Sequence, residues 1–258
     1  MKVKRLLVLL PVFALIACSS LGKEITKEEA TAKAAAIEEN QQNTNVFSFV
    51  YKIVTRINDT TEKREYKYTL DEEGNYMLSR VEKEISPSGV YKNSKTIYNV
   101  KLEALNRVFY VNTFDGSTNQ ETTLAYSSLA SGSEELENAI QKQSAFKDEI
   151  VDFYNSVVFA KDKNMGDKYN VDAHYYTSGE GNLTTQISYT YNGEQNASTI
   201  KKITNTFKYS NNLFSSYNAS YVTFGGNKRT EKATNSYKKI RVNLPADWEQ
   251  CVITSVSI

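Results

Sequence analysis

The chain of 258 residues is poor in the residue types that build disulfide frameworks, metal sites and phosphate loops. It has two cysteines, one histidine, three prolines and eleven glycines. His174, the single histidine, cannot supply a two-histidine metal site, and zinc sites generally use several His or Cys ligands. Neither a glycine-rich phosphate loop nor a Gly-x-Ser-x-Gly nucleophile motif occurs. We therefore expect no catalytic residue, no metal and no cofactor.

An acidic stretch, Asp71–Asn75, is the one segment that invites a calcium site. It lacks the alternating oxygen ligands and the downstream Glu of an EF-hand loop. A hairpin turn with solvated acids explains it better.

Long apolar runs are also lacking. The run at the N-terminus, Leu6–Ala17, is about a dozen residues, whereas a membrane-spanning helix needs about 20. Three basic residues and no acid precede it: Lys2, Lys4 and Arg5. A basic segment followed by a short apolar run predicts a secretory signal peptide over residues 1–17.

The signal ends in the residues Leu15-Ile16-Ala17-Cys18. This pattern resembles the lipobox of bacterial lipoproteins, in which the signal is cleaved between a small residue and a cysteine. The resemblance implies cleavage between Ala17 and Cys18, and a thioether-linked diacylglyceryl group on the Cys18 sulfur. An ordinary signal peptide with a chance cysteine is the alternative.

Acyl chains on Cys18 would hold the protein at the extracytoplasmic face of a cell membrane or outer membrane. Two or more chains anchor stably, because each buried methylene contributes about 0.8 kcal/mol. Ser19 follows the cysteine. In lipoproteins of two-membrane bacteria that residue permits an outer-membrane destination, and the choice of membrane stays open.

The charge of the mature chain is close to balanced. Without the signal, 28 of the 31 basic residues remain against 30 acidic ones, a formal charge of −2. No basic patch or stripe stands out along the sequence, so we expect no nucleic-acid partner. If Cys18 is lipidated, Cys251 has no partner for a disulfide, and we expect it to be a small, buried or partly buried residue.

Periodicity predicts a single β-rich domain over residues 26–258, after the lipidated cysteine and a tether at 18–25. Thr26 and Glu29 match a capping box, which predicts a helix over 26–42. The apolar period then changes to two, which predicts strands over 46–126. A strongly apolar stripe at spacings of three and four predicts a second helix over 133–159. Strands resume over 168–244, ending near Pro245.

The predicted fold is α+β and mostly antiparallel: a curved meander sheet or half-barrel of about ten strands, with an N-terminal helix and a central apolar helix. This element order resembles the envelope lipoprotein-carrier proteins and the mycobacterial lipid-carrier lipoproteins. Their half-barrels receive acyl chains on the concave side, below the helices. The resemblance implies a lipid or another hydrophobic small molecule as ligand.

Aromatic residues recur on alternating strand positions; the chain has 18 Tyr and 11 Phe. Such a face either lines an acyl-binding cavity or fills a core completely. The candidate ligand face comprises Phe47, Phe49, Tyr51, Tyr66, Tyr68, Ile150, Phe153, Tyr189, Tyr191 and Phe207.

The sequence thus favours a non-enzymatic, membrane-anchored lipoprotein that binds a hydrophobic ligand. The first alternative is a surface protein-interaction or adhesion lipoprotein, because the last strands present a long Thr/Ser/Asn/Lys-rich face. The second is a hydrolase of unknown substrate, because paired carboxylates meet only in space. A protein partner stays unidentified.

Overall fold

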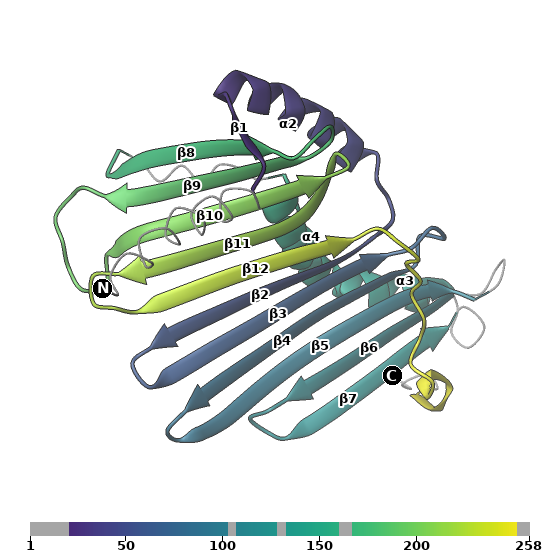
Figure 1. Cartoon of the computed structure of the whole chain (residues 1–258). Helices are drawn as coiled ribbons and strands as arrows, with labels where there is room; N and C mark the ends of the chain where they lie inside the picture. Colours follow the sequence, from purple (N-terminus) through teal and green to yellow (C-terminus); the bar gives the residue numbers. More distant parts are fainter. Residues whose placement is uncertain (1–20, 103–106, 128–132, 160–166, 252–258) are drawn as a thin grey trace, which may run out of the picture.

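A computed structural model describes residues 21–102, 107–127, 133–159 and 167–251. Twelve strands form one curved, antiparallel sheet in the order β1-β8-β9-β10-β11-β12-β2-β3-β4-β5-β6-β7 (Figure 1). The first half contains β1 (Lys23–Ile25), α2 (Lys27–Gln42), β2 (Phe47–Ile57), β3 (Thr60–Leu70), β4 (Tyr76–Ser86), β5 (Gly89–Lys101), β6 (Arg107–Asp115) and β7 (Gln120–Ser127). The second half contains α3 (Ser133–Lys142), α4 (Ser144–Val158), β8 (Tyr169–Thr177), β9 (Leu183–Tyr191), β10 (Ile200–Ser210), β11 (Leu213–Thr223), β12 (Lys228–Ser236) and the 3-10 helix η1 (Trp248–Cys251).

The mostly antiparallel half-barrel predicted from the sequence is confirmed, with twelve strands rather than about ten. One of the additional strands is β1, which lies within the segment expected to be a tether. It pairs with β8 at the sheet edge, with Lys23 opposite Thr177 and Ile25 opposite Tyr175. The last strand ends at Ser236 instead of near residue 244. The chain leaves the sheet there, and Lys239 has a positive φ of 51°.

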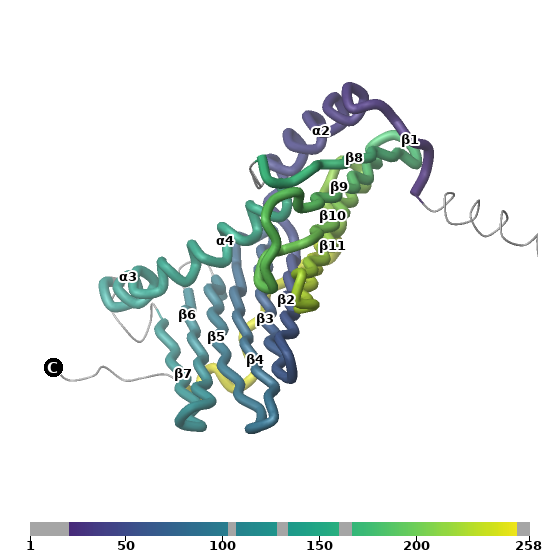
Figure 2. Tube along the Cα trace, turned by 90° about the vertical axis from the view of Figure 1, so that its left-hand side faces the viewer, coloured from purple at the N-terminus to yellow at the C-terminus, as the bar shows by residue number. Residues whose placement is uncertain are grey.

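The sheet consists of two meanders, β2–β7 and β8–β12, that join where β12 pairs with β2. Strand β7 lies at one edge of the sheet, and β8 lies beside β1 at the opposite edge. Helices α3 and α4 connect these two strands and therefore cross one face of the sheet (Figure 2). Hairpins connect neighbouring strands as the turn residues predict. At the β10–β11 turn, Asn211 and Asn212 both have positive φ, 55° and 57°. That pair of conformations matches the right-handed twist of the two strands.

Helix α2 begins at the predicted capping box. The Thr26 hydroxyl accepts a hydrogen bond from the Glu29 backbone N–H at 3.2 Å, and Glu29 Oε2 accepts from the Thr26 N–H at 3.0 Å. Two otherwise exposed donors are thereby satisfied.

The single helix expected over 133–159 is divided into α3 and α4. Gln143 separates them, with φ −103° and ψ 5°. Helix α4 carries the more deeply packed face, with five buried residues: Phe146, Ile150, Tyr154, Val157 and Val158. The division lets each short helix follow the curvature of the sheet beneath it.

The core lies between α4 and the inward face of the middle strands. The Tyr154 ring stacks on Phe47 with centroids 4.4 Å apart and meets Phe49 edge to face at 5.2 Å. Phe153, one residue earlier, packs against Tyr66 at 4.5 Å. Such pairs add about 0.5–1.5 kcal/mol each beyond the burial of their area. This part of the aromatic face is therefore a filled core.

Beyond Ser236 the chain runs along the opposite face of the sheet from α4 (Figures 1 and 2). Val242 is buried on this path, and its backbone N–H donates to Asp71 Oδ2 at 3.0 Å. Cys251 is partly buried in η1, as expected for a small apolar residue.

Candidate hydrophobic-ligand cavity

A cavity of about 440 Å³ lies between α2, the C-terminal end of α4 and the sheet strands β8–β12 and β2. Its walls are mostly apolar or aromatic. The helices contribute Ala34, Ile37, Phe153, Val157, Val158 and Phe159. The strands contribute Tyr51, Tyr175, Leu183, Ile187, Tyr189, Phe207, Tyr209 and Tyr217. A volume of this size falls in the range of small-molecule sites, about 300–1,000 Å³.

Four of the ten residues of the candidate ligand face line this cavity: Tyr51, Phe153, Tyr189 and Phe207. They come from three regions of the chain, namely β2, α4 and the pair β9–β10. The sheet curvature brings them together on one side of α4.

The other six lie elsewhere. Four are buried core residues: Phe47, Phe49, Tyr66 and Ile150. Tyr68 packs against the same core, with its ring 4.8 Å from that of Phe47. Tyr191 lies in an aromatic group with Tyr169 and Phe224, at centroid distances of 5.1 and 6.3 Å. A filled core and a cavity, which the sequence left as alternatives, are thus both present, and residues such as Tyr51 and Val157 belong to both.

One end of the cavity is polar and centres on Glu231 of β12, whose side chain is 1% exposed. Its Oε2 accepts hydrogen bonds from the hydroxyls of Tyr51 at 2.7 Å and Tyr217 at 3.1 Å. Its Oε1 lies 2.6 Å from Arg229 Nη2, in an ion pair without an aligned hydrogen bond. The Arg229 charge offsets part of the free-energy cost of burying the Glu231 carboxylate. The cluster of Glu231, Arg229 and the two tyrosines therefore has a net charge close to zero.

Burial and the neighbouring carboxylate change the acidities of this group. Burial, followed by the charge of Glu231, raises the pKa of the Tyr51 and Tyr217 hydroxyls well above the ordinary value. Burial lowers the pKa of Arg229, but the Glu231 charge together with Tyr51 and Tyr221 outweighs burial, and the net direction is upward. Both tyrosines therefore remain hydrogen-bond donors to Glu231 at neutral pH.

Asn205 of β10 supplies a second acceptor. Its Oδ1 is buried and has no hydrogen-bond partner among the described residues, and Asn205 lines the cavity. Sheet register places Asn205 opposite Ala219, and Ala219 opposite Glu231. With strands about 4.8 Å apart, the two acceptor residues lie roughly 10 Å from one another across a small alanine. A buried polar atom without a partner costs about 1–3 kcal/mol, which a ligand with a donor would offset.

Gln41 near the end of α2 attaches this helix to the sheet. Its Nε2 donates to the Tyr154 hydroxyl at 3.0 Å. Its Oε1 accepts from the Phe214 backbone N–H and from the Tyr237 hydroxyl, each at 3.0 Å. Gln41 is 3% exposed and lines the cavity. One side chain thus connects α2, α4 and the β11 backbone around the cavity wall.

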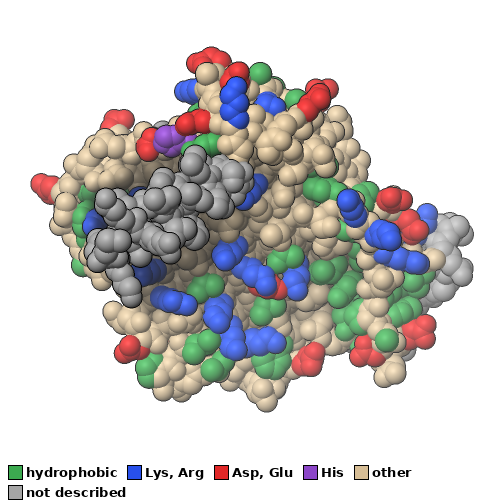
Figure 3. All heavy atoms as spheres, viewed as in Figure 1, with side chains coloured by type: hydrophobic (Ala, Val, Ile, Leu, Met, Phe, Trp, Pro, Cys, Tyr) green, Lys and Arg blue, Asp and Glu red, His purple; other side chains and the backbone are tan. Residues whose placement is uncertain are grey.

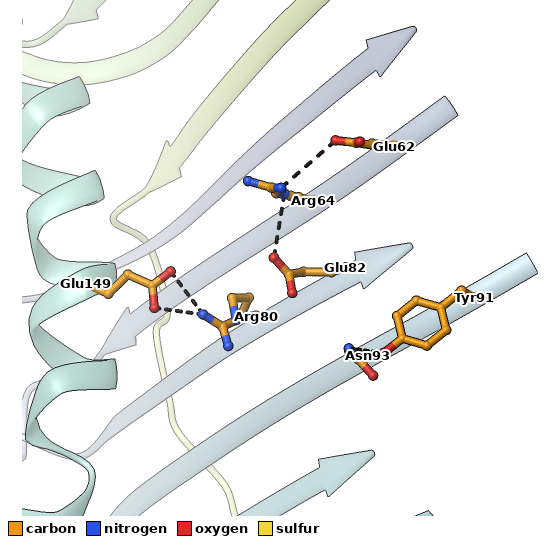
Figure 4. Close-up of polar contacts among 7 residues, drawn as sticks. All are labelled: Glu62, Arg64, Arg80, Glu82, Tyr91, Asn93 and Glu149. Atoms are coloured by element: carbon orange, nitrogen blue, oxygen red, sulfur yellow. Dashed lines mark hydrogen bonds and ion pairs between the residues drawn. The ribbon is translucent and has the colours of Figure 1, made fainter. Parts of the chain in front are cut away.

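Helix α4 is held to the sheet by charge as well as by its apolar face. Arg80 Nη1 of β4 donates to both oxygens of Glu149, at 3.1 and 2.8 Å (Figure 4). Farther along the same face Arg64 lies between Glu62 and Glu82, at 3.9 and 3.5 Å (Figure 4). The Arg80–Glu149 pair helps to position the helix whose end closes the cavity.

The two sequence segments weighed for catalysis or metal binding lie away from the cavity. His174 is at the exposed β8 edge, with Nδ1 2.8 Å from Glu24 Oε1 and Nε2 3.3 Å from Asp172 Oδ1. Asp71–Asn75 forms the β3–β4 hairpin turn expected for it, with Glu72 and Glu73 exposed, but the expectation of solvated acids is wrong for Asp71, which is buried. Asp71 Oδ1 accepts backbone hydrogen bonds there from Glu73 at 3.1 Å and Asn75 at 2.9 Å.

The residues that make the cavity polar carry almost no signal in the sequence. Glu231 and Arg229 lie in the run Lys228–Ser236, which is polar almost throughout and has no apolar alternation to predict an inward face. Asn205 interrupts the alternating apolar positions of β10. The sequence does give one indication that Gln41 is buried, because it lies four residues after Ile37 on the same face of the helix.

Cys18 and Ala17, the predicted lipid-attachment and cleavage residues, lie outside the described part of the chain. Among the helices that are described, none combines the length and the hydropathy of a membrane span.

No protein-family model matches the chain, and no curated protein matches its sequence. Several solved structures are similar to it at low identity. A LolA superfamily protein from Nitrosomonas europaea is 12% identical, with a TM-score of 0.21, over 84% of this chain and 94% of that one. A putative outer membrane lipoprotein-sorting protein domain from Vibrio parahaemolyticus is 7% identical, with a TM-score of 0.25, over 87% and 98%. A porin-like protein from Bacteroides uniformis is 7% identical, with a TM-score of 0.26, over 76% and 97%. TM-scores this low carry no argument about the ligand or the function of this chain.

Proposed function

We propose that this protein is a non-enzymatic, membrane-anchored extracytoplasmic lipoprotein that binds a lipid or another hydrophobic ligand. The observation that carries the proposal is the cavity of about 440 Å³ between α2, α4 and the sheet. Its aromatic and aliphatic walls suit an acyl chain; Arg229 and Glu231 form a polar cluster at one end, and Glu38, Gln41 and Thr185 add polar groups elsewhere along the wall. A mostly apolar lining with a small number of polar groups is typical of ligand sites.

The polar end supports a ligand whose head group donates hydrogen bonds. Asn205 Oδ1 is buried without a partner among the described residues, and the Glu231 carboxylate lies two strands away. Both are acceptors, so a hydroxyl or an ammonium group satisfies them, whereas an ester without a donor leaves Asn205 unsatisfied. A monoacylglycerol should therefore bind more tightly than the methyl ester of the same fatty acid.

Anchoring follows from the Leu15–Cys18 pattern. Cleavage before Cys18 and acylation of its sulfur would leave the cysteine only five residues before β1, which begins at Lys23. Five extended residues span at most about 18 Å. The folded domain would then lie close to the bilayer from which a lipid ligand could come.

The binding proposal is tested with the form that begins at Ser19, which retains every described element. Native mass spectrometry after expression in bacteria should find a lipid adduct, and added monoacylglycerol should displace it. Recovery of the bare polypeptide mass alone, without response to added fatty acids or monoacylglycerols, would contradict the proposal.

A pair of tryptophan variants on β9 locates the ligand. Ile187→Trp adds bulk inside the cavity and should lower ligand affinity at least tenfold. Gln186→Trp adds the same side chain on the opposite face of the strand and should bind like the parent. Melting temperatures of both variants separate lost binding from lost folding, because overpacking costs about 1–3 kcal/mol.

The anchor is tested separately in the full chain. Labelled palmitate should enter the parent protein and not Cys18→Ser, which should also remain unprocessed. Retention of a cleaved Cys18→Ser protein in the membrane would remove the lipoprotein proposal while leaving the cavity proposal intact.

A further inference from the structure

The sheet face opposite α4 collects basic side chains. Across the neighbouring strands β9–β12 and β2–β5, residues that alternate with the buried inward positions point to this side. Strands β2–β4 contribute Lys52, Arg56, Lys63, Lys67 and Lys83. Strands β5, β10 and β12 contribute Lys92, Lys202, Lys208, Lys228 and Lys232. We call these ten side chains the basic face. On this side of strands β2–β5 and β9–β12, Glu65 is the one acidic side chain.

Figure 3, which views this side of the molecule, shows lysine and arginine side chains gathered over the middle strands of the sheet. The sequence shows no such patch, because the ten residues are spread over more than 180 positions and alternate with uncharged ones. Strand pairing assembles them. The sequence therefore has no basic patch along the chain, whereas the folded surface does have one.

The register sets like charges directly opposite one another. Lys63 lies opposite Lys83, and Lys83 lies opposite Lys92. Across the junction of the two meanders, Lys232 lies opposite Lys52. Like charges in these positions destabilise a sheet. No ion pair joins Lys63, Lys83 or Lys92 to an acid among the described residues, so an external anion is the natural source of compensation.

The inward face of the same strands is different. Arg64 lies between Glu62 and Glu82, and Arg80 pairs with Glu149 (Figure 4). Positive and negative groups alternate there and neutralise one another. The excess of positive charge is therefore confined to one side of the sheet.

A hairpin tip at one end of the basic face exposes an apolar side chain. Val90, near the start of β5, is 64% exposed and lies on the same side of its strand as Lys92. The β4–β5 hairpin that carries it extends to one end of the sheet (Figure 1). Exposed apolar groups beside a basic surface are typical of proteins that lie on a membrane interface.

We propose that the basic face and this tip dock on a bilayer that contains anionic lipids. Nine of the ten basic residues are lysines, whose compact charge suits a fluid layer of head groups better than the bidentate recognition that arginine favours. Each lysine near such a surface contributes about 1 kcal/mol of attraction. The apolar tip favours a bilayer over a soluble polyanion, because only a bilayer offers an apolar phase. This docking is independent of the cavity and of Cys18.

Vesicle co-sedimentation of the form that begins at Ser19 tests the proposal. The vesicles contain either phosphatidylcholine alone or an equal mixture with phosphatidylglycerol. The test variant reverses four charges of the basic face: Lys63→Glu, Lys83→Glu, Lys92→Glu and Lys232→Glu. The control variant makes the same change in net charge elsewhere: Lys27→Glu, Lys142→Glu, Lys147→Glu and Lys168→Glu. Circular dichroism verifies that both variants are folded.

The parent and the control should bind the anionic vesicles at least tenfold more tightly than phosphatidylcholine vesicles. The test variant should bind the anionic vesicles about 100-fold more weakly than the parent. Raising the salt from 0.1 to 0.5 M should weaken the parent and leave the test variant nearly unchanged. Equal binding of test and control variants would overturn the proposal. So would tighter binding of the parent to soluble polyphosphate than to vesicles at equal phosphate concentration.

The hairpin tip is tested by Val90→Ser. Binding to anionic vesicles should weaken about tenfold while its salt dependence stays the same, because an apolar contribution is lost. Val171→Ser is the matched control, since Val171 is 60% exposed on β8, outside the basic face. Loss of binding in the control to the same extent, or no loss in the tip variant, would contradict a bilayer as the partner.

Discussion

Asp71 and Val242, 171 positions apart in the chain, are joined by a hydrogen bond in which the Val242 backbone N–H donates to Asp71 Oδ2 at 3.0 Å. The same carboxylate organises the β3–β4 turn through Asn75, whose backbone N–H donates to Oδ1 at 2.9 Å and whose Nδ2 donates to Oδ2 at 3.1 Å. A local turn acid therefore also holds the C-terminal segment against the sheet.

Replacing this carboxylate should destabilise the fold. Asp71→Ala leaves several buried donors without an acceptor, and we expect the free energy of unfolding in urea to fall by about 2–4 kcal/mol. Asp59→Ala, at the exposed β2–β3 turn, is the control and should change stability by less than about 0.5 kcal/mol. A small effect of Asp71→Ala would mean that water replaces the carboxylate at little cost.

Gln41 should be important for both stability and ligand binding. Gln41→Leu removes the partner of the Tyr154 hydroxyl, the Phe214 N–H and the Tyr237 hydroxyl, so we expect a loss of about 2–4 kcal/mol by chemical denaturation. Gln42→Leu, on the exposed neighbouring residue, should behave like the parent. Hydrogen exchange of α2 amides should accelerate in Gln41→Leu only, since that helix loses its buried attachment. Equal exchange rates in the two variants would contradict this role.

The ion pair at the polar end of the cavity should show strong coupling between its members. Glu231→Leu leaves the buried Tyr51 and Tyr217 hydroxyls without an acceptor and Arg229, which is 44% exposed, without its carboxylate, and should cost about 2–4 kcal/mol. The double variant Glu231→Leu with Arg229→Met should recover part of that loss, because the unpaired charge is then absent while the two hydroxyls still lack an acceptor. A double-mutant cycle in urea measures the coupling. Additive effects of the two changes would show that the pair does not act as a unit.

His174 should titrate above its ordinary pKa. The hydrogen bond to Glu24 first, and then the charge of Asp172, raise its pKa from 6.5. A raised pKa in the folded state means that the pairing stabilises β1 on β8 below pH 6.5 and that this contribution is lost as the pH rises through the folded-state pKa. Because His174 is the single histidine, its NMR titration is unambiguous. Glu24→Gln should lower the midpoint, whereas Glu28→Gln should not. A parent midpoint at or below 6.5 would contradict the pairing.

Local patterns predicted the elements of this fold well. The Thr26 and Glu29 capping box predicted the start of α2, because both partners lie within one helical turn. The alternation at Phe47, Phe49 and Tyr51 predicted a buried face, because side-chain direction in a strand depends only on sequence parity. The break at Gln143 was missed, since the apolar stripe continues through it and only the curved sheet beneath requires two shorter helices.

The sequence by itself determined the strands and helices, the hairpin turns and the side of each strand that is apolar, because these depend on neighbours within a few residues. Tertiary structure alone decided which strands meet. The pairing of β12 with β2 brings Glu231 to Tyr51, 180 positions away, and aligns Lys232 with Lys52. Both the polar end of the cavity and the basic face depend on that pairing. Long-range strand partners are selected by the packing of the whole sheet, and no local period records them.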